Sequence, residues 1–283
     1  PFKGLFTQGM VCHETYKDEN NNWVSPDELV VKDGKKFLKG TEKLVKIGPS
    51  ESMSKSKRNT IDPEKIINDY GADSARLFIL SDSPPEKDVQ WSDEGINSSY
   101  KFIQKLWILN QKIIQEIEAD HPLSQNNDLE KITNKFIKEI THNIENFSYN
   151  KIIANFHETY SALNKIILSK IDRKNLVENY KKILVAFSPV IPHFSSECME
   201  MIDIKENLSW PKFDEKILIE DNIKFIVQFN GKTRKIIISK KGTAEDTLLN
   251  KIKEDNKLNG YLNNKDIKKK IFIPDRLINI ITN

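Results

Sequence analysis

Cysteine is scarce in this sequence: the 283 residues include only Cys12 and Cys198. The two lie far apart, and neither has a second cysteine or a histidine at the spacing that metal ligands require. A disulfide scaffold and a zinc site are both disfavoured, and we expect the chain to form no metal site of its own. The same scarcity favours a reducing compartment, in which thiols stay free.

Long apolar runs are also missing. The stretch Leu184–Phe194 is short and interrupted by proline, so it cannot cross a bilayer, and we expect no membrane partner. The first residues do not have the pattern of a secretory signal peptide. The chain opens with Pro1 and not with methionine, which indicates processing or truncation, and we expect a truncated chain.

The composition that is present suits a soluble protein with several domains. Hydrophobic residues make up 38% and charged residues 30%. Because single cores usually belong to units of about 100–200 residues, we expect two or three units. From Ile223 to the end the chain has 14 basic and 6 acidic residues, whereas the preceding part has 30 and 35. The basic C-terminal fifth therefore indicates a polyanion partner.

The N-terminal part mixes strand and helix signals. The apolar run Gly4–Val11 predicts a buried strand. Residues 12–48 contain asparagine and aspartate clusters and glycine-centred turns, which are typical of a small hairpin-rich insert. Further on, Asp62 is placed to cap a helix that has Pro63 at its first position and ends at Gly71.

A short apolar run at residues 75–80 suits either a helix or a strand. From residue 95 to about residue 209 the apolar residues recur at the spacing of an α-helix. Segment Ser188–Phe194 breaks the last long helix and starts a short one. We expect Trp91 and Trp107 to be core anchors. Four amphipathic stripes with short polar turns predict an antiparallel bundle, and they run through residues 96–117, 129–144, 152–167 and 177–187.

The basic C-terminal part returns to strand patterns. Apolar residues alternate over Ile223–Phe229, and the following Asn230-Gly231 pair is typical of a type I′ hairpin turn that leads into a second strand. Thr243 is placed to cap a helix that runs to about Lys257, and two more apolar strands follow it. These elements predict a small α+β domain of about 60 residues.

One short stretch has the composition of a phosphate site. Gly48–Asn59 reads GPSESMSKSKRN, in which basic residues alternate with serines and bulky side chains are few. Serine hydroxyls and backbone N–H groups give directed hydrogen bonds to phosphate, and lysine adds positive charge. Composition alone leaves a solvated basic loop as the alternative.

The context of this loop supports the phosphate interpretation. Tyr70–Phe78 reads YGADSARLF, and class I aminoacyl-tRNA synthetases carry GADxxR on the helix that follows their KMSKS signature. That signature resembles Ser52, Met53, Ser54, Lys55 and Ser56 here. Further segments resemble the leucyl-tRNA synthetases of that class and cover the chain in order: PFKGLFTQGMV, WVSP, SPPEKDVQWSDEGI, PVIPHFSSE, SWP, VQFNGKTRKIII and IPDRLINII.

The isoleucyl and valyl enzymes are the nearest alternatives within the class. They typically have a short connection before the loop and continue the signature as SLGN, whereas this chain has the longer insert at residues 12–48 and reads SKSKRN. The leucyl family is therefore the better match. One position departs from its pattern: the first lysine of the signature is Ser52. The departure implies weaker ATP binding, while Lys55 keeps the position tied to catalysis.

The resemblance implies a multidomain architecture for the C-terminal portion of such an enzyme. Residues 1–95 would be the remnant of an α/β, Rossmann-like nucleotide-binding domain, with a short leucine-specific insert at about 12–48 and the signature loop at 52–56. Residues 96–212 would be an all-α helical bundle of the anticodon-binding type. Residues 220–283 would be a small basic α+β domain that binds tRNA.

The resemblance also implies a reaction, in which leucine is activated with ATP and passed to the 3′ end of leucine tRNA. Lys55 would be catalytic, and ATP, as substrate, would contact Met53, Ser54, Lys55 and Ser56. Mg²⁺ is expected for the full enzyme, and no cofactor is expected on this chain alone. The histidine motif that completes the ATP site is absent, so we expect the isolated chain to be inactive; the histidines, none in such a motif, are His13, His121, His142, His157 and His193.

Leucine tRNA is the implied partner of the helical bundle and the basic tail, besides leucine and ATP in the full enzyme. A monomer is expected, in the cytoplasm of a bacterium or the matrix of an organelle. The alternative function is a free-standing tRNA-binding module or one subunit of a split synthetase. The candidates for tRNA contact, each with a merely solvated side chain as the alternative, are Lys232, Arg234, Lys235, Lys268, Lys269 and Lys270.

Overall fold

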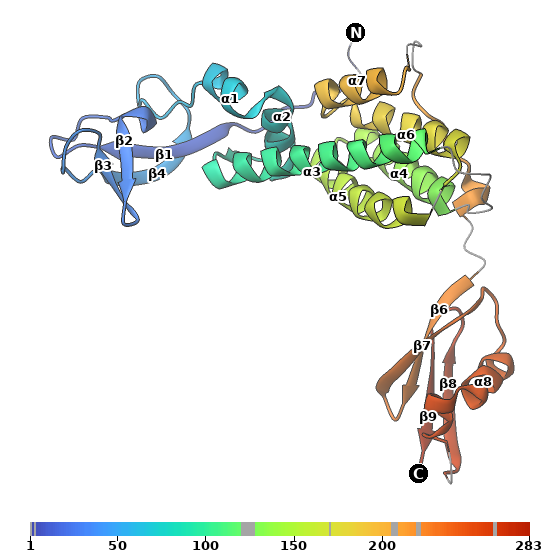
Figure 1. The fold of residues 1–283 in the computed structure, drawn as a ribbon. Coiled ribbons are helices and arrows are strands. Elements are labelled where there is room, and N and C mark those ends of the chain that lie inside the picture. The colour runs from blue at the N-terminus through green and yellow to red at the C-terminus, as the bar shows by residue number, and fades with distance from the viewer. Residues whose placement is uncertain are drawn as a thin grey trace. The chain divides into compact units, whose positions relative to one another are not determined.

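A computed structural model describes residues 2, 4–119, 128–169, 171–204, 209–218, 222–262 and 265–283 of the chain. The chain divides into two compact units, residues 1–217 and 218–283 (Figure 1). Each unit has its own hydrophobic core. Residues 120–127 of the predicted bundle, and with them His121, lie outside the described residues. The predicted division of the first unit at residue 95 stays a prediction.

The first unit begins with a three-stranded sheet of order β4-β1-β5. Strand β1 (Val11–Lys17) pairs antiparallel with β4 (Lys46–Ser52) and parallel with β5 (Val89–Gln90). The chain between β1 and β4 forms the predicted hairpin, in which a 3₁₀ turn, η1 (Pro26–Glu28), leads into β2 (Leu29–Lys32) and β3 (Lys35–Leu38). We call residues 18–45 the insert. Val24 and Val45 form a small core with Tyr16 of β1, and Leu29 and Leu38 pack against it.

The predicted buried strand over residues 4–11 is wrong. Strand β1 starts only at Val11, and the side chain of Leu5 is 90% exposed. The N–H of Gly9 donates to the Pro85 oxygen and that of Met10 to the Asp88 carboxylate, both at 2.8 Å, so this segment is bonded to the chain ahead of β5 without forming a ladder. An apolar run is buried only where a second layer covers it, and local sequence does not show that layer.

Two short helices follow the signature loop. Helix α1 (Pro63–Tyr70) begins as predicted: Asp62 accepts the N–H of Glu64, and Pro63 occupies the first turn. Gly71 ends it with φ at 84°, a left-handed conformation that glycine adopts without strain. The run at residues 75–80 is helical and belongs to α2 (Ala72–Ser81).

The predicted bundle is present, and Figure 1 shows its long helices lying side by side. Buried isoleucine, leucine and phenylalanine side chains form its core, with Phe136, Phe156 and Phe187 in mutual ring contact. No helix of the described part is long and apolar enough to span a bilayer. The elements of the bundle region are α3 (Asp93–Glu118), α4 (Asp128–Glu145), α5 (Tyr149–Ile166), η2 (Ile167–Ser169), α6 (Arg173–Phe187), α7 (Pro192–Met201) and η3 (Glu215–Leu218).

Two expectations about single residues in this unit differ in outcome. Trp91 packs edge-on against buried Phe78, whereas Trp107 is 37% exposed, with its ring edge-on to Phe194. The prediction of a core anchor is therefore wrong for Trp107, because the buried stripe of α3 passes through the neighbouring Leu106 and Leu109.

The second unit is a four-stranded sheet of order β7-β6-β9-β8, with helices on one face. The predicted hairpin turn is confirmed, since Asn230 and Gly231 have φ of 50° and 76°. The Thr243 cap is wrong: α8 starts after Ala244, and the Thr243 hydroxyl bonds to the Lys240 oxygen. The elements are β6 (Asn222–Phe229), β7 (Lys232–Lys240), α8 (Glu245–Glu254), α9 (Asn256–Asn259), β8 (Ile267–Ile273) and β9 (Leu277–Thr282).

Candidate functional site

The signature loop leaves the edge of the first sheet. Strand β4 lies at that edge and ends at Ser52, which is paired with Cys12 of β1. The N–H of Met53 still donates to the Val11 oxygen at 3.1 Å, and the chain then turns away from the sheet. The loop therefore starts from a fixed strand end and projects beyond the sheet.

Asn59 closes the base of this loop. Its side chain is fully buried: Oδ1 accepts the N–H of Ser54 at 2.8 Å, and Nδ2 donates to the oxygens of His13 and Glu51 at 3.2 and 3.1 Å. These bonds join both ends of the loop to β1 and β4. Sequence reasoning missed this residue; a buried asparagine ending a basic loop has no pattern that separates it from an exposed one.

Lys55 is the free cation of the loop. Its side chain is exposed, and within the described residues its ammonium has no hydrogen-bond or ion-pair partner. Ser54 and Ser56 lie beside it, with their hydroxyl oxygens 3.2 Å apart, and the N–H of Lys57 donates to the Ser54 hydroxyl at 3.3 Å. Internal bonds thus shape the loop while one ammonium stays available to an anion.

The other two cations of the loop are already paired. The ammonium of Lys57 bonds to the Glu51 carboxylate across the neck of the loop. The guanidinium of Arg58 reaches Glu28 in η1 at 2.8 Å. Of the three basic residues of this stretch, Lys57 and Arg58 therefore form ion pairs that hold the loop, whereas the ammonium of Lys55 forms none among the described residues.

His13 is buried beside the base of the loop. Burial, followed by the nearby ammonium of Lys36, lowers the pKa of His13 below its usual value, and Nδ1 is buried without a hydrogen-bond partner in the described structure. Both features favour the neutral imidazole. The cysteines are buried and free, and burial raises the pKa of the Cys198 thiol to about 12, so this thiol stays protonated.

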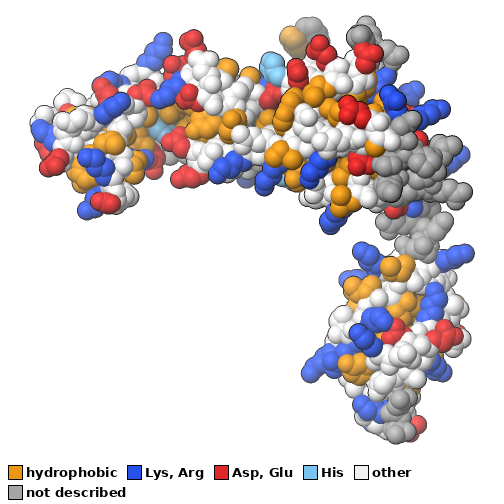
Figure 2. Space-filling view, viewed as in Figure 1, with side chains coloured by type: hydrophobic (Ala, Val, Ile, Leu, Met, Phe, Trp, Pro, Cys, Tyr) orange, Lys and Arg blue, Asp and Glu red, His pale blue; other side chains and the backbone are white. Residues whose placement is uncertain are grey.

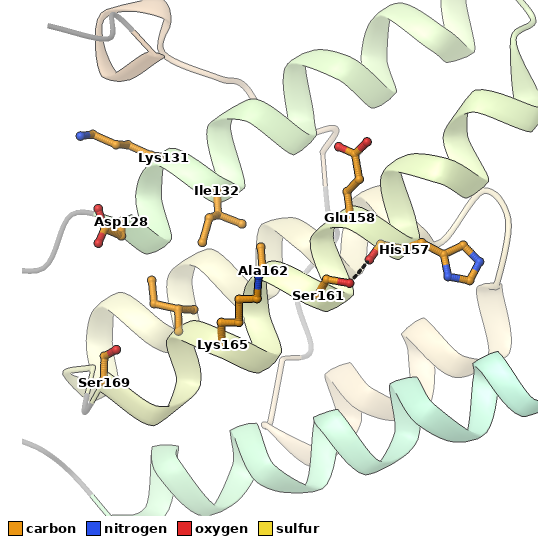
Figure 3. A pocket seen from close by; sticks show the side chains of 10 residues that line it. Asp128, Lys131, Ile132, His157, Glu158, Ser161, Ala162, Lys165 and Ser169 are labelled. Carbon is orange, nitrogen blue, oxygen red and sulfur yellow. Dashed lines mark hydrogen bonds between the residues drawn. The ribbon is translucent and has the colours of Figure 1, made fainter. Parts of the chain in front are cut away.

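A separate open hollow of about 850 Å³ lies on the bundle between α4 and α5. Figure 3 shows Ile132 of α4 pointing toward Ala162 and Lys165 of α5, while Lys131 extends outward at the rim. Its lysines are balanced by Asp128 and Glu158, and no residue of the signature loop lines it. The hollow is not a continuation of the loop site.

The predicted tRNA-contact residues form two groups in the second unit. Lys232, Arg234 and Lys235 lie on β7, and the three lysines at 268–270 lie on β8. These strands are the two edges of the sheet, with β6 and β9 between them, so the groups are roughly 14 Å apart at the usual strand spacing. The structure brings each group together but does not merge them into one patch.

The six side chains also differ in their partners. Lys235 is ion-paired with Asp255, and Lys270 contacts Glu245 at 2.9 Å. The Arg234 guanidinium lies 4.8 Å from the centre of the Tyr261 ring. The remaining three are exposed, without a side-chain partner among the described residues: Lys232, Lys268 and Lys269.

The sheet face opposite α8 carries apolar side chains that sequence reasoning missed. Ile236 and Ile238 of β7 are 53% and 62% exposed, and Ile271 and Ile273 of β8 are each 39% exposed. Figure 2 shows hydrophobic side chains at the surface of this unit next to lysine and arginine. Strand alternation could have indicated them, since Ile236 and Ile238 are two positions apart, as are Ile271 and Ile273, so each pair lies on one face of its strand.

Two family models match the chain. The model described as "tRNA synthetases class I (I, L, M and V)" matches residues 41–92, which include the loop. The model described as "Anticodon-binding domain of tRNA ligase" matches residues 126–249, which cover much of the bundle and run into the second unit.

Curated relatives match along nearly the whole chain. Leucine–tRNA ligase of Rickettsia conorii is 40% identical over 285 aligned residues, and that of Hyphomonas neptunium is 37% identical over 286. Each alignment covers 99% of this chain and 34% of the relative, so the chain spans about a third of the length of these proteins.

Among solved structures, the Agrobacterium radiobacter K84 agnB2 LeuRS, crystallised as a ternary LeuRS-tRNA-LeuAMS complex, shares the fold with a TM-score of 0.65. The match covers 82% of this chain and 32% of that one at 21% sequence identity. The fold of that part of the chain is therefore shared with that structure.

Proposed function

This chain belongs to the leucine–tRNA ligase family of class I aminoacyl-tRNA synthetases, and from that premise we propose that it forms the C-terminal part of such an enzyme. The complete enzyme would join leucine to ATP with release of pyrophosphate, and would then transfer the leucyl group to the 3′ end of leucine tRNA. The chain would contribute the signature loop and the tRNA-binding parts.

Lys55 carries this proposal, because it is an unpaired ammonium on a loop whose base is held by buried Asn59. During adenylate formation the bond between the α- and β-phosphates breaks, and negative charge builds on the departing pyrophosphate. An ammonium placed on those oxygens stabilises the transition state, and loss of one such donor typically costs about 2.7–4 kcal/mol. Ser54, Ser56 and the Met53 backbone would shape the loop around ATP.

The chain is not expected to form leucyl-adenylate by itself. His13 is buried, and the other described histidines do not lie at the signature loop, so the second half of the ATP site must come from elsewhere in the enzyme. Within the described residues, no three His, Cys, Asp or Glu side chains converge on a metal position, so no step is assigned to Mg²⁺ here. Any Mg²⁺ would arrive with the phosphates of ATP.

Binding of leucine tRNA is the second part of the proposal. The bundle would contact the body of the tRNA, and the second unit would add phosphate contacts from its lysines. Such contacts release counterions, so the affinity would fall steeply as salt rises. We propose a monomer that acts in the cytoplasm of a bacterium or in an organelle matrix.

The test is leucine-dependent exchange of pyrophosphate into ATP by an intact ligase that contains this chain. K55A should lower kcat about 100- to 1,000-fold, the usual loss when a transition-state donor is removed. K57A is the matched control and should stay within about threefold, since Lys57 forms only a half-exposed ion pair. Equal losses of kcat in K55A and K57A would mean that the total positive charge of the loop matters, and not the position of Lys55. Exchange by the isolated chain would refute its dependence on other domains.

A further inference from the structure

One side chain joins the signature loop to the insert. Arg58 donates to Oε1 of Glu28 at 2.8 Å and, from its other terminal nitrogen, to the backbone oxygen of Trp23 at 3.2 Å. Both acceptors belong to the insert and lie 30 and 35 positions earlier in the chain. A planar guanidinium that satisfies two separate acceptors is fixed in direction as well as in place.

The backbone of Arg58 is unusual in a way that matches this role. Its φ is 53°, in the left-handed region that residues with a Cβ atom rarely adopt. The N–H of the same residue donates to the Lys55 oxygen at 3.3 Å, which closes the turn that carries Lys55. The side-chain contacts with the insert therefore help to hold an unfavourable backbone conformation next to the free cation.

The Glu28 carboxylate that accepts this bond is itself held in place by a second hydrogen bond. Glu28 uses its other oxygen, Oε2, to accept the N–H of Ser25 at 2.9 Å, so both carboxylate oxygens are occupied. The bond from Ser25, followed by that from Arg58, holds the pKa of Glu28 below its usual value, so the carboxylate is charged at neutral pH. Pro26 starts the 3₁₀ turn between these residues and limits its freedom.

The outgoing limb of the loop is thus held at two neighbouring points. Asn59 ties it to the sheet, and Arg58 ties it to the insert. We propose that Arg58 is a positioning residue through which the insert sets the resting position of the signature loop, and with it the position of Lys55. The link itself is independent of the reaction, whereas its effect on ATP rests on the proposed function.

Amide hydrogen exchange over residues 53–58 of this chain tests the link. R58N removes the guanidinium. Asparagine tolerates the left-handed conformation, so this substitution does not strain the backbone as well. E28Q keeps the bond to Ser25 and removes the charge that faces Arg58. Exchange should become about threefold faster in each, the size expected for a half-exposed pair. The double variant should exchange no faster than R58N alone, because R58N already removes the bond to Glu28 that E28Q weakens.

K65A is the matched control. Lys65 of α1 also reaches the insert, at Asp27, but over 3.4 Å and with both side chains 63% exposed. Its replacement should leave the exchange of residues 53–58 unchanged. If R58N leaves this exchange unchanged, or if K65A raises it equally, the positioning role of Arg58 is overturned.

The intact ligase gives the second readout. R58N and E28Q should each raise the KM for ATP in pyrophosphate exchange, by about threefold, and leave the KM for leucine unchanged. A loop that loosens without any change in the KM for ATP would overturn the effect on Lys55. Absence of leucine-dependent exchange in the unmodified ligase would instead count against the proposed function, and the hydrogen-exchange result would still decide the link.

Discussion

The carboxylate of Asp73 lies at the N-terminus of α7, where Oδ2 accepts the backbone N–H of Phe194 at 2.7 Å. Its other oxygen accepts the N–H of His193 at 3.3 Å and lies 2.9 Å from Nδ1 of the same residue. On the next turn of α2, Arg76 donates to the oxygens of Val190 and Pro189 at 2.9 and 2.7 Å. The GADSAR segment thereby fastens the helix pair behind the signature loop to the bundle, and this contact bridges about 120 positions of sequence.

Replacement of this cap should destabilise the first unit. In D73N the side-chain amide would direct N–H toward one of the two backbone N–H groups that the carboxylate now satisfies. We expect a loss of about 1–2 kcal/mol in the free energy of unfolding, the usual value of a helix cap, measured by urea denaturation. D69N on the exposed face of α1 is the control and should change little. Equal effects of the two variants would contradict the capping role.

Local signals predicted the elements whose causes are local. Asp62, Pro63 and Gly71 bound α1 as expected, and the Asn230-Gly231 pair turns the hairpin. These features depend on backbone conformations that single residues prefer, so the sequence shows them directly.

One error comes from a competing local contact, whereas the missed roles at the site depend on contacts between residues far apart in the sequence. Thr243 has the chemistry of a cap, but its hydroxyl bonds within the strand-end turn at Lys240, and α8 starts without it. Of the candidate site, Lys55 is predicted by the resemblance, and its catalytic role stays a prediction. The contacts of Asn59 and Arg58 could not be predicted, because their partners lie up to 46 positions away.

Asn59 should be essential for the fixed base of the loop. In N59D the second carboxylate oxygen would face the backbone oxygens of His13 and Glu51, which now receive hydrogen bonds. Because a buried group left unsatisfied costs about 1–3 kcal/mol, we expect a loss of that size, visible in thermal or urea unfolding. N68A on the exposed side of α1 is the control. A fully stable N59D would show that the loop base does not depend on this amide.

Stability of the first unit should fall as the pH drops through the range in which His13 titrates. Burial, and then Lys36, lowers the pKa of this imidazole from 6.5 in the folded state. Above 6.5 neither state holds the proton; below it the unfolded state binds a proton that the folded state refuses, so the stability falls until the folded-state pKa is reached. Urea unfolding at pH 7.5 and 5.5 measures the difference.

The variant H13F separates this effect from other acid-sensitive groups. Phenylalanine keeps an aromatic ring at the edge of Tyr16, which His13 now meets at 5.7 Å, and it cannot titrate. Its loss of stability between the two pH values should be smaller than that of the unmodified chain. H142F, on the exposed side of α4, should retain the full loss. Identical pH dependence in all three proteins would exclude His13 as the source.

Salt dependence should distinguish the unpaired lysines of the second unit from the paired ones. Lys268 and Lys269 have no side-chain partner among the described residues, whereas Lys235 and Lys270 face Asp255 and Glu245. If the first pair contacts two phosphates, K268A/K269A should reduce the slope of log affinity against log salt by about 1.8, at about 0.9 per contact.

The paired lysines supply the matched double variant. A lysine whose charge already faces a carboxylate displaces fewer counterions from RNA, so K235A/K270A should reduce the slope by less than K268A/K269A does. Fluorescence anisotropy with leucine tRNA over a salt series measures both slopes. Equal slopes for the two double variants would mean that the ion pairs open on binding. In that case all four lysines would act alike, and the two strand edges would contribute equally to the interface.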